Sequence, residues 1–234
     1  MLSVKCGCGF GDVLNPVKGR PIQAVLFDLD GTLIDALERL AVSFYHAFRQ
    51  LNIAEPDEQT FWRAFADYQM GRLVPVHLRD RFFSLMLQHY GNYAGEVRLI
   101  PGAIETLQFC HQQGYGMAVI TSRLSSPEQV RAELARAGID GYIPVIKTHQ
   151  HVPISSVLAK EQRLLEAVQE LGAAPERSLY IGDLPEDVSS ARRAGLGLSV
   201  AVLTGGIKRE ILANRQPDII LNSVSELPGY LRGS

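Results

Sequence analysis

The sequence predicts an α/β protein whose core is a parallel sheet with helices on both faces, and which carries a helical insertion after the first strand. Short apolar runs alternate with amphipathic helical patterns along most of the 234-residue chain. This alternation is typical of parallel strands joined by crossover helices. Between residues 35 and 101 it stops, and only helical patterns remain.

The predicted strands are short and apolar. The first spans residues 24–27 and contains no polar residue, as expected of a central strand that is covered on both faces. Similar runs follow at residues 117–121, 144–146, 179–181, 198–202 and 218–221. Together they predict one continuous parallel sheet.

The insertion carries three stripes of apolar residues at helical spacing. The first runs from Leu37 to Leu51, the second includes Phe61 and Phe65, and the third ends at Tyr90. We therefore divide the chain into an N-terminal extension (1–20), an α/β core (21–35 and 97–234) and a helical cap (36–96).

Composition and charge narrow the class of protein. A hydrophobic fraction of 46% and a charged fraction of 21% are ordinary for a globular protein. The net charge is −2 with no long basic run, so we expect no nucleic-acid partner. No apolar run is long enough to span a bilayer, and the N-terminus lacks the apolar stretch of a signal peptide. We expect a cytoplasmic protein without a membrane partner, either a monomer or a homodimer.

Two acidic residues directly follow the first strand. Asp28 and Asp30 are two positions apart, so they lie on one side of an extended segment, and Gly31 and Thr32 then end the strand with a turn. Ligand sites of open parallel sheets lie at the carboxyl ends of the strands. Two carboxylates there repel each other unless a cation or a shared proton compensates. The pair therefore predicts a metal site or acid–base chemistry.

Three segments carry a family resemblance. Residues 28–35, Asp-Leu-Asp-Gly-Thr-Leu-Ile-Asp, resemble the first motif of the haloacid dehalogenase-like hydrolases, a family dominated by phosphatases. The apolar strand that ends at Thr121 is similar to the second motif, and residues 182–187, Gly-Asp-Leu-Pro-Glu-Asp, resemble the acidic metal-binding loop. The resemblance covers about residues 22–232 and implies a Rossmann-like core with a helical cap.

The family also has a lysine ahead of the acidic loop, and this chain offers two. The Lys-Pro pair that is common among the family's phosphatases does not occur here. Lys160 opens the helical pattern of residues 161–171, whereas Lys147 follows an apolar run and is typical of a solvated strand end. We favour Lys160.

The resemblance implies a role for each of these residues. It makes Asp28 the nucleophile that forms an aspartyl-phosphate, and Asp30 the general acid and base. It assigns the phosphoryl oxygens to Thr121 and Lys160, with Ser122 as a further substrate contact. It also implies a Mg²⁺ ion held by Asp28, Asp183 and the Asp30 main-chain carbonyl, with Asp187 a second acidic ligand or an orienting partner.

The substrate is expected to be a small phosphate ester. The C-terminal segments 202–206 and 217–228 are similar to the phosphoglycolate phosphatase-like branch, which makes 2-phosphoglycolate one candidate. Basic residues around Gly71 are candidate substrate contacts in the cap, because arginine binds carboxylates and phosphates with two hydrogen bonds. They are Arg72, His77, Arg79 and Arg81.

Other functions compete with this interpretation. A phosphomutase of the β-phosphoglucomutase type shares all the motifs, and a non-catalytic binding module could retain the fold. A dehalogenase is disfavoured, since it has no leaving oxygen to protonate and does not need Asp30. A zinc site built from Cys6 and Cys8 with His149 and His151 would need both histidines as ligands, and histidines of this kind are more often loop residues.

Overall fold

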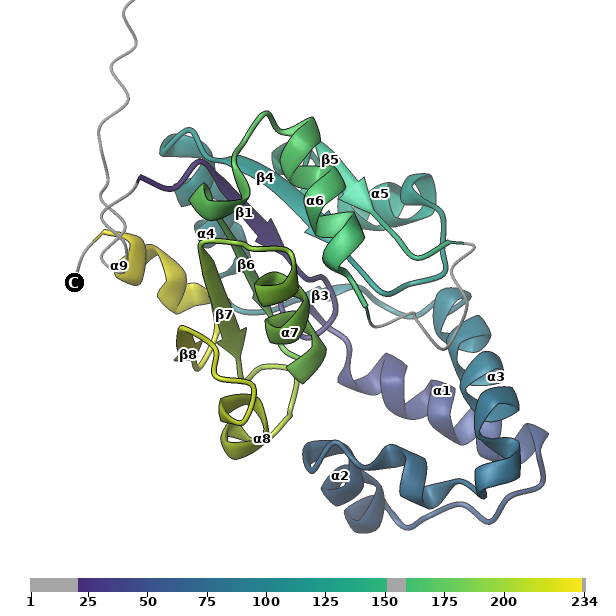
Figure 1. Cartoon of the computed structure of the whole chain (residues 1–234). Helices are drawn as coiled ribbons and strands as arrows, with labels where there is room; N and C mark the ends of the chain where they lie inside the picture. Colours follow the sequence, from purple (N-terminus) through teal and green to yellow (C-terminus); the bar gives the residue numbers. More distant parts are fainter. Residues whose placement is uncertain (1–20, 151–158, 233–234) are drawn as a thin grey trace, which may run out of the picture.

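A six-stranded parallel sheet forms the centre of the molecule (Figure 1). The computed structural model describes residues 21–150 and 159–232. The strand order is β5-β4-β1-β6-β7-β8, so β1 lies inside the sheet between β4 and β6. The strands are β1 (Ala24–Phe27), β4 (Gly116–Ile120), β5 (Val145–Lys147), β6 (Ser178–Gly182), β7 (Leu198–Val202) and β8 (Ile219–Leu221).

Helices cover both faces of this sheet, because side chains alternate along each strand. Val25 and Phe27 of β1 pack in one apolar cluster, to which α4 (Ala103–Gln112), α5 (Pro127–Arg136) and α9 (Leu227–Leu231) contribute. Ala24 and Leu26 belong to a second cluster with α6 (Glu161–Glu170) and α7 (Pro185–Arg193). The predicted fold class is confirmed.

The predicted strands agree with the structure to within two residues at each end. The expectation of a purely helical stretch between residues 35 and 101 is wrong in one respect. β2 (Ile34–Asp35) and β3 (Arg98–Leu99) pair antiparallel where the chain enters and leaves the helical insertion. Strands of two residues are too short to show an alternating pattern, which is why the sequence does not reveal them.

Between β2 and β3 the chain folds into helices with an aromatic interior. They are α1 (Leu37–Gln50), α2 (Glu58–Ala66) and α3 (Arg79–Gly91), with the 3-10 turns η1 (Met70–Leu73) and η2 (Val76–Leu78) before α3. Phe48 and Phe82 join α1 to α3, with ring centroids 4.7 Å apart. The same cluster includes Val188 of α7 and Leu212 of α8 (Arg209–Ala213), so the helical insertion packs against the core.

None of the helices within the described ranges is long and apolar enough to cross a membrane. Cys110 is fully buried on α4. Burial raises the pKa of its thiol to about 12.

Candidate active site

The carboxyl ends of three neighbouring strands bring the predicted site residues together. Asp28 follows β1, Thr121 follows β4 and Asp183 follows β6. Because these strands are parallel and adjacent, their ends lie at one edge of the sheet. All three residues are buried, with at most 4% of their surface exposed, and all three line one cavity of ≈ 690 Å³.

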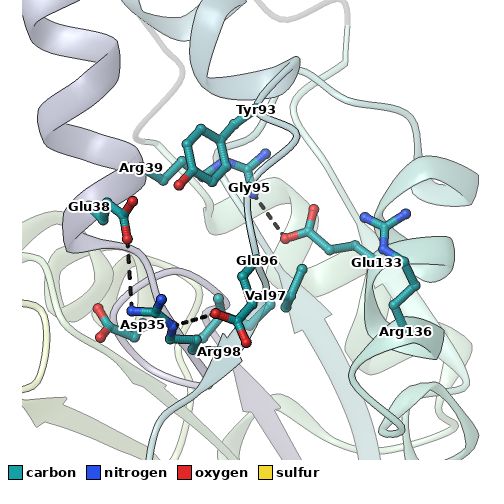
Figure 2. Close-up of a pocket in the computed structure, with 11 residues that line it drawn as sticks. Asp35, Glu38, Arg39, Tyr93, Gly95, Glu96, Val97, Arg98, Glu133 and Arg136 are labelled. Carbon is teal, nitrogen blue, oxygen red and sulfur yellow. Dashed lines mark hydrogen bonds and ion pairs between the residues drawn. The ribbon is translucent and has the colours of Figure 1, made fainter.

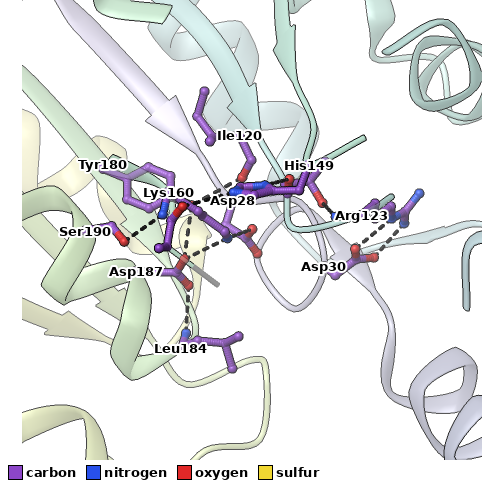
Figure 3. Close-up of polar contacts among 12 residues, drawn as sticks. Asp28, Asp30, Ile120, Arg123, His149, Lys160, Tyr180, Leu184, Asp187 and Ser190 are labelled. Atoms are coloured by element: carbon purple, nitrogen blue, oxygen red, sulfur yellow. Dashed lines mark hydrogen bonds and ion pairs between the residues drawn. The ribbon is translucent and has the colours of Figure 1, made fainter. Parts of the chain in front are cut away.

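Lys160 lies at the centre of the polar contacts (Figure 3). It precedes α6, is 2% exposed, and its Nζ donates to Asp28 Oδ1 at 2.5 Å, Asp187 Oδ1 at 2.8 Å and Tyr180 Oη at 3.0 Å. Burial alone would lower the pKa of this lysine, but the charges of Asp187 and Asp28 raise it well above its usual value. Lys160 is therefore a fixed cation beside Asp28.

Lys147, the competing lysine, lies elsewhere. It ends β5 and pairs with Glu170 at 2.6 Å, and the side chains of this pair are 23% and 53% exposed. It is not among the residues that line the cavity. The geometry thus places Lys160, and not Lys147, next to Asp28.

Three carboxylates share a small buried volume. Asp28, Asp183 and Asp187 each offer an oxygen within 4.8 Å of the others. Burial raises the pKa of Asp28 to about 7, and the nearby charge of Asp187 adds to the effect. Burial and the charge of Asp28 raise the pKa of Asp183 well above its usual range. A cation at this cluster would offset the repulsion.

Asp183 and Asp187 differ in their hydrogen bonds. Asp183 Oδ1 is buried and has no partner among the described residues. Both oxygens of Asp187 are engaged, Oδ1 by Lys160 and Tyr180, and Oδ2 by the main-chain N–H of Leu184 at 2.9 Å. A hard divalent ion such as Mg²⁺ fits the carboxylate oxygens of Asp28 and Asp183. Asp187 is placed to orient Lys160.

Two glycines make room for the Asp183 carboxylate. A Cβ at Gly205 would lie 1.8 Å from Asp183 Oδ2, and one at Gly31 would lie 2.6 Å from the same oxygen. Gly31 also has φ +82°, a conformation that side chains rarely adopt. Any larger residue at Gly205 would displace Asp183 from its place beside Asp28.

Asp30 is held by an arginine that follows the strand β4. Arg123 Nε and Nη2 donate to the two oxygens of Asp30 at 2.7 and 2.6 Å, as Figure 3 shows. Burial alone would raise the pKa of Asp30, but the charge and hydrogen bonds of Arg123 lower it below its usual range. The Asp30 side chain is thus fixed as a carboxylate that faces Arg123.

The same arginine begins a chain of ion pairs that reaches the helical insertion. Arg123 Nη1 donates to Glu133 of α5 at 2.6 Å, and the other oxygen of Glu133 accepts from Arg39 of α1 at 2.9 Å. Arg39 Nε then donates to the main-chain carbonyl of Tyr90 on α3 at 2.8 Å. Asp30 is therefore linked to α1, α3 and α5.

Two hydroxyl groups after β4 are candidates for binding the phosphoryl oxygens. Ser122 Oγ is buried without a partner among the described residues, and Ser122 lines the cavity with Thr121. Thr121 Oγ1 accepts from the main-chain N–H of Arg123 at 3.3 Å. Both side chains can take part in binding phosphoryl oxygens at this strand end.

A second, much smaller cavity lies beside the entry to the insertion (Figure 2). Its volume of ≈ 30 Å³ is that of about one water molecule. Around it Arg98 pairs with Glu96 at 2.9 Å and with Glu38 at 3.8 Å. This cavity is too small for a substrate.

Residues 25–201 match the sequence model of a family described as haloacid dehalogenase-like hydrolase. The chain belongs to this family. It is therefore an enzyme of the hydrolase class, as its motifs predict.

Curated relatives and solved structures agree with this assignment. The chain is 27% identical over 210 residues to the pyrophosphatase PpaX of Halalkalibacterium halodurans, covering 88% of this chain and 95% of the relative. It is 28% identical over 211 residues to a phosphoglycolate phosphatase of Synechococcus elongatus, again covering 88% and 95%.

Among solved structures, a haloacid dehalogenase-like hydrolase from Streptococcus pneumoniae superimposes with a TM-score of 0.72 at 23% identity, covering 89% of this chain and 98% of the other. A candidate β-phosphoglucomutase from Thermotoga maritima shares the fold with a TM-score of 0.62 at 17% identity, covering 90% and 99%.

The basic cap residues predicted as substrate contacts do not line the large cavity. Arg72, His77 and Arg81 are exposed, and Arg79 Nε donates to the main-chain carbonyl of Val74 at 3.3 Å. Their neighbours Gly71 and Asp80 do line it. Helical spacing alone does not show which side of this turn faces the cavity.

His149 contacts the main chain with both of its ring nitrogens. Its ring nitrogens lie 2.9 Å from the main-chain oxygen of Thr121 and 3.1 Å from that of Ala159. It thereby ties the residue before Lys160 to the end of β4, with both ring nitrogens facing main-chain oxygens. Cys6, Cys8 and His151 lie outside the described residues.

The motifs did not reveal Arg123, Glu133 and Tyr180 as part of the site. One signal for Glu133 was available, because it follows Val130 by three positions on α5 and precedes Leu134, which places it on the buried face of that helix. A charged residue on such a face needs a partner. The sequence does not indicate which residue that partner is.

Proposed function

We propose that the chain is a Mg²⁺-dependent phosphatase that hydrolyses a small-molecule phosphomonoester through an aspartyl-phosphate. One observation carries this proposal above the others. The Asp28 carboxylate accepts from the fixed cation of Lys160, lies within 4.8 Å of a carboxylate oxygen of Asp183, and opens on a cavity large enough for a substrate. Asp183 Oδ1 has no partner among the described residues.

In the first half of the reaction an oxygen of Asp28 attacks phosphorus. A P–O bond forms to Asp28, and the bond to the leaving oxygen breaks. Asp30 gives its proton to that oxygen. Since Arg123 holds Asp30 as a carboxylate, this contact has to loosen before Asp30 can carry the proton.

In the second half a water attacks the phosphorus of the aspartyl-phosphate. Asp30 takes the proton of the water, the bond to Asp28 breaks, and inorganic phosphate leaves. For this step the carboxylate form of Asp30, which Arg123 favours, is the form required. Lys160, Thr121 and Ser122 stabilise the phosphoryl oxygens in both halves.

The metal is assigned to the oxygens of Asp28 and Asp183, with the Asp30 main-chain carbonyl as a further ligand. When bound, Mg²⁺ would neutralise the charge that develops between nucleophile and phosphoryl group. Asp187 keeps Lys160 in place and is not needed as a ligand.

The test is release of inorganic phosphate from a panel that includes 2-phosphoglycolate and hexose phosphates, with and without Mg²⁺. Pyrophosphate belongs in the panel because a relative is named for it. We expect activity that a chelator removes and Mg²⁺ restores, and that the near-isosteric Asp28→Asn protein lacks. Activity in that variant would exclude Asp28 as the nucleophile. Transfer of phosphate to a sugar instead of water would favour the mutase.

A further inference from the structure

The cavity in front of Asp28 is larger than a two-carbon substrate requires. Its volume of ≈ 690 Å³ lies in the range of sites that bury ligands of drug size. One side is formed by the strand ends of the core, and the other by α1, α3 and the turn that precedes α3. In Figure 1, α1 and α3 run side by side, and they are in contact. A phosphate at Asp28 would occupy only the core end of this space.

Most of the remaining cavity wall is apolar. Most of the side chains that the helical insertion contributes are aliphatic or aromatic, and several are only partly buried, so that a ligand could cover them. They include Leu37, Leu40, Phe44, Phe83, Met86 and Leu87. Apolar surface of this kind gains free energy when a ligand removes it from water, by roughly 25 cal/mol per Å².

The charged residues that line the cavity disfavour a substrate whose leaving group carries a negative charge. Each arginine or lysine in the lining already faces a carboxylate: Lys160 at Asp28 (2.5 Å), Arg123 at Asp30 (2.6 Å) and Arg193 at Glu161 (3.1 Å).

Among the described residues, no further arginine or lysine lines the cavity. The insertion instead contributes the carboxylate of Asp80. α7 contributes that of Glu186, which accepts from the Tyr68 hydroxyl and pairs with Arg215 at 3.8 Å. A second negative charge on the substrate would be repelled here and would find no free cation.

We propose that the physiological substrate is a phosphomonoester whose leaving group carries a bulky apolar portion and no carboxylate. This inference rests on the proposed phosphatase function and narrows its substrate class. It separates this chain from the substrate by which one of its relatives is named, because 2-phosphoglycolate is small and carries a carboxylate.

The first test measures binding without hydrolysis. Three phosphonates share the headgroup and differ only at the far end: propylphosphonate, 3-phenylpropylphosphonate and 3-phosphonopropionate. Calorimetry in the presence of Mg²⁺ should show that 3-phenylpropylphosphonate binds roughly 10- to 100-fold more tightly than propylphosphonate, the gain expected for burying an aromatic ring. The carboxylate compound should bind more weakly than propylphosphonate. Equal binding of all three, or a preference for the carboxylate, would overturn the inference.

Two leucines of α3 provide a matched pair of variants. Leu87 lines the cavity and Leu85 does not, although both are partly buried. Leu87→Ala should remove most of the preference for the phenyl compound and leave propylphosphonate unchanged, whereas Leu85→Ala should leave both affinities unchanged. Leu40→Ala repeats the test from α1. A phenyl preference that survives both cavity variants would place the apolar group elsewhere and contradict the proposal.

Hydrolysis of the corresponding phosphate esters separates the two claims. 3-Phenylpropyl phosphate and propyl phosphate have leaving oxygens of the same kind, so a difference in kcat/KM reports the cavity and not the chemistry. Turnover that favours the phenyl ester supports both the function and its substrate class. Turnover without this preference would support the proposed phosphatase function and overturn the proposed substrate class. Tight binding of the phenyl phosphonate without turnover of any ester would support the preference of the cavity for an apolar group and overturn the proposed phosphatase function.

Discussion

At the scale of a residue, the two lysines show how burial changes the cost of losing a charge. Lys160 is buried between Asp28 and Asp187, so Lys160→Ala leaves two carboxylates uncompensated. We expect it to lower the free energy of unfolding by about 3–5 kcal/mol and to abolish turnover. Lys147→Ala breaks only the partly exposed pair with Glu170 and should cost about 1 kcal/mol or less.

Urea unfolding and phosphate release measure both effects. If Lys147→Ala were the more damaging change, the assignment of the phosphate-binding lysine would be reversed.

Gly205 allows a second prediction about a single position. A methyl group there would collide with Asp183, so Gly205→Ala should raise the Mg²⁺ concentration needed for half-maximal activity by roughly 10- to 100-fold. Gly141 is a suitable control, because a Cβ at that position meets nothing within 4 Å. A Mg²⁺ titration of both variants gives the comparison. An unchanged requirement in Gly205→Ala would show that Asp183 does not hold the metal.

The sequence alone identified those site residues whose position follows from a local pattern. Asp28 and Asp183 each follow an apolar strand, and parallel strands bring such positions to one edge. Arg123 and Tyr180 act through contacts with residues far along the chain, such as the pair of Arg123 with Asp30. Contacts of this kind depend on how helices and loops pack, and a motif carries no information about them.

At the scale of elements, the buried ion pairs around Glu133 join α5 to α1 and to the loop after β4. Glu133→Gln removes the charge that Arg39 and Arg123 share and keeps the size of the side chain. We expect a loss of about 3–5 kcal/mol in the free energy of unfolding. We also expect lower kcat, because Arg123 then holds Asp30 less firmly.

Glu170→Gln is the matched control, since that carboxylate belongs to an exposed pair. It should change stability by about 1 kcal/mol or less and leave kcat as it is. Similar losses in the two variants would mean that the ion pairs around Glu133 add nothing beyond a surface contact.

Elements of the sheet were more predictable than the geometry of the insertion. Buried parallel strands are continuous apolar runs, and each run in the core became a strand. The insertion was predicted as helical from its stripes, but a stripe does not show against which surface it packs. That is why Leu87 and Phe83 could not be recognised as cavity residues, while Arg72 and Arg79 were expected to be.

At the scale of the whole molecule, the crowded carboxylates make stability depend on pH and metal. In the metal-free protein the pKa of Asp28 rises from 3.8 to about 7, chiefly through burial. Between these values the folded state holds a proton that the unfolded state has released. The free energy of unfolding must therefore fall as pH rises through this window, by up to about 1.4 kcal/mol per pH unit for one such group.

Mg²⁺ should reverse this trend, because it binds the ionised carboxylates and not the protonated ones. We expect the increase in Tm on adding Mg²⁺ to be larger at pH 7.5 than at pH 5, measured by thermal unfolding of the full chain. Asp28→Asn is the control: its metal-free stability should fall less steeply between pH 4 and pH 7, since position 28 no longer titrates. A wild-type protein whose metal-free stability falls no more steeply with pH than that of Asp28→Asn would show that Asp28 is ionised without metal. In that case Lys160 alone would compensate its charge, and the acidic cluster would not require a second cation for folding.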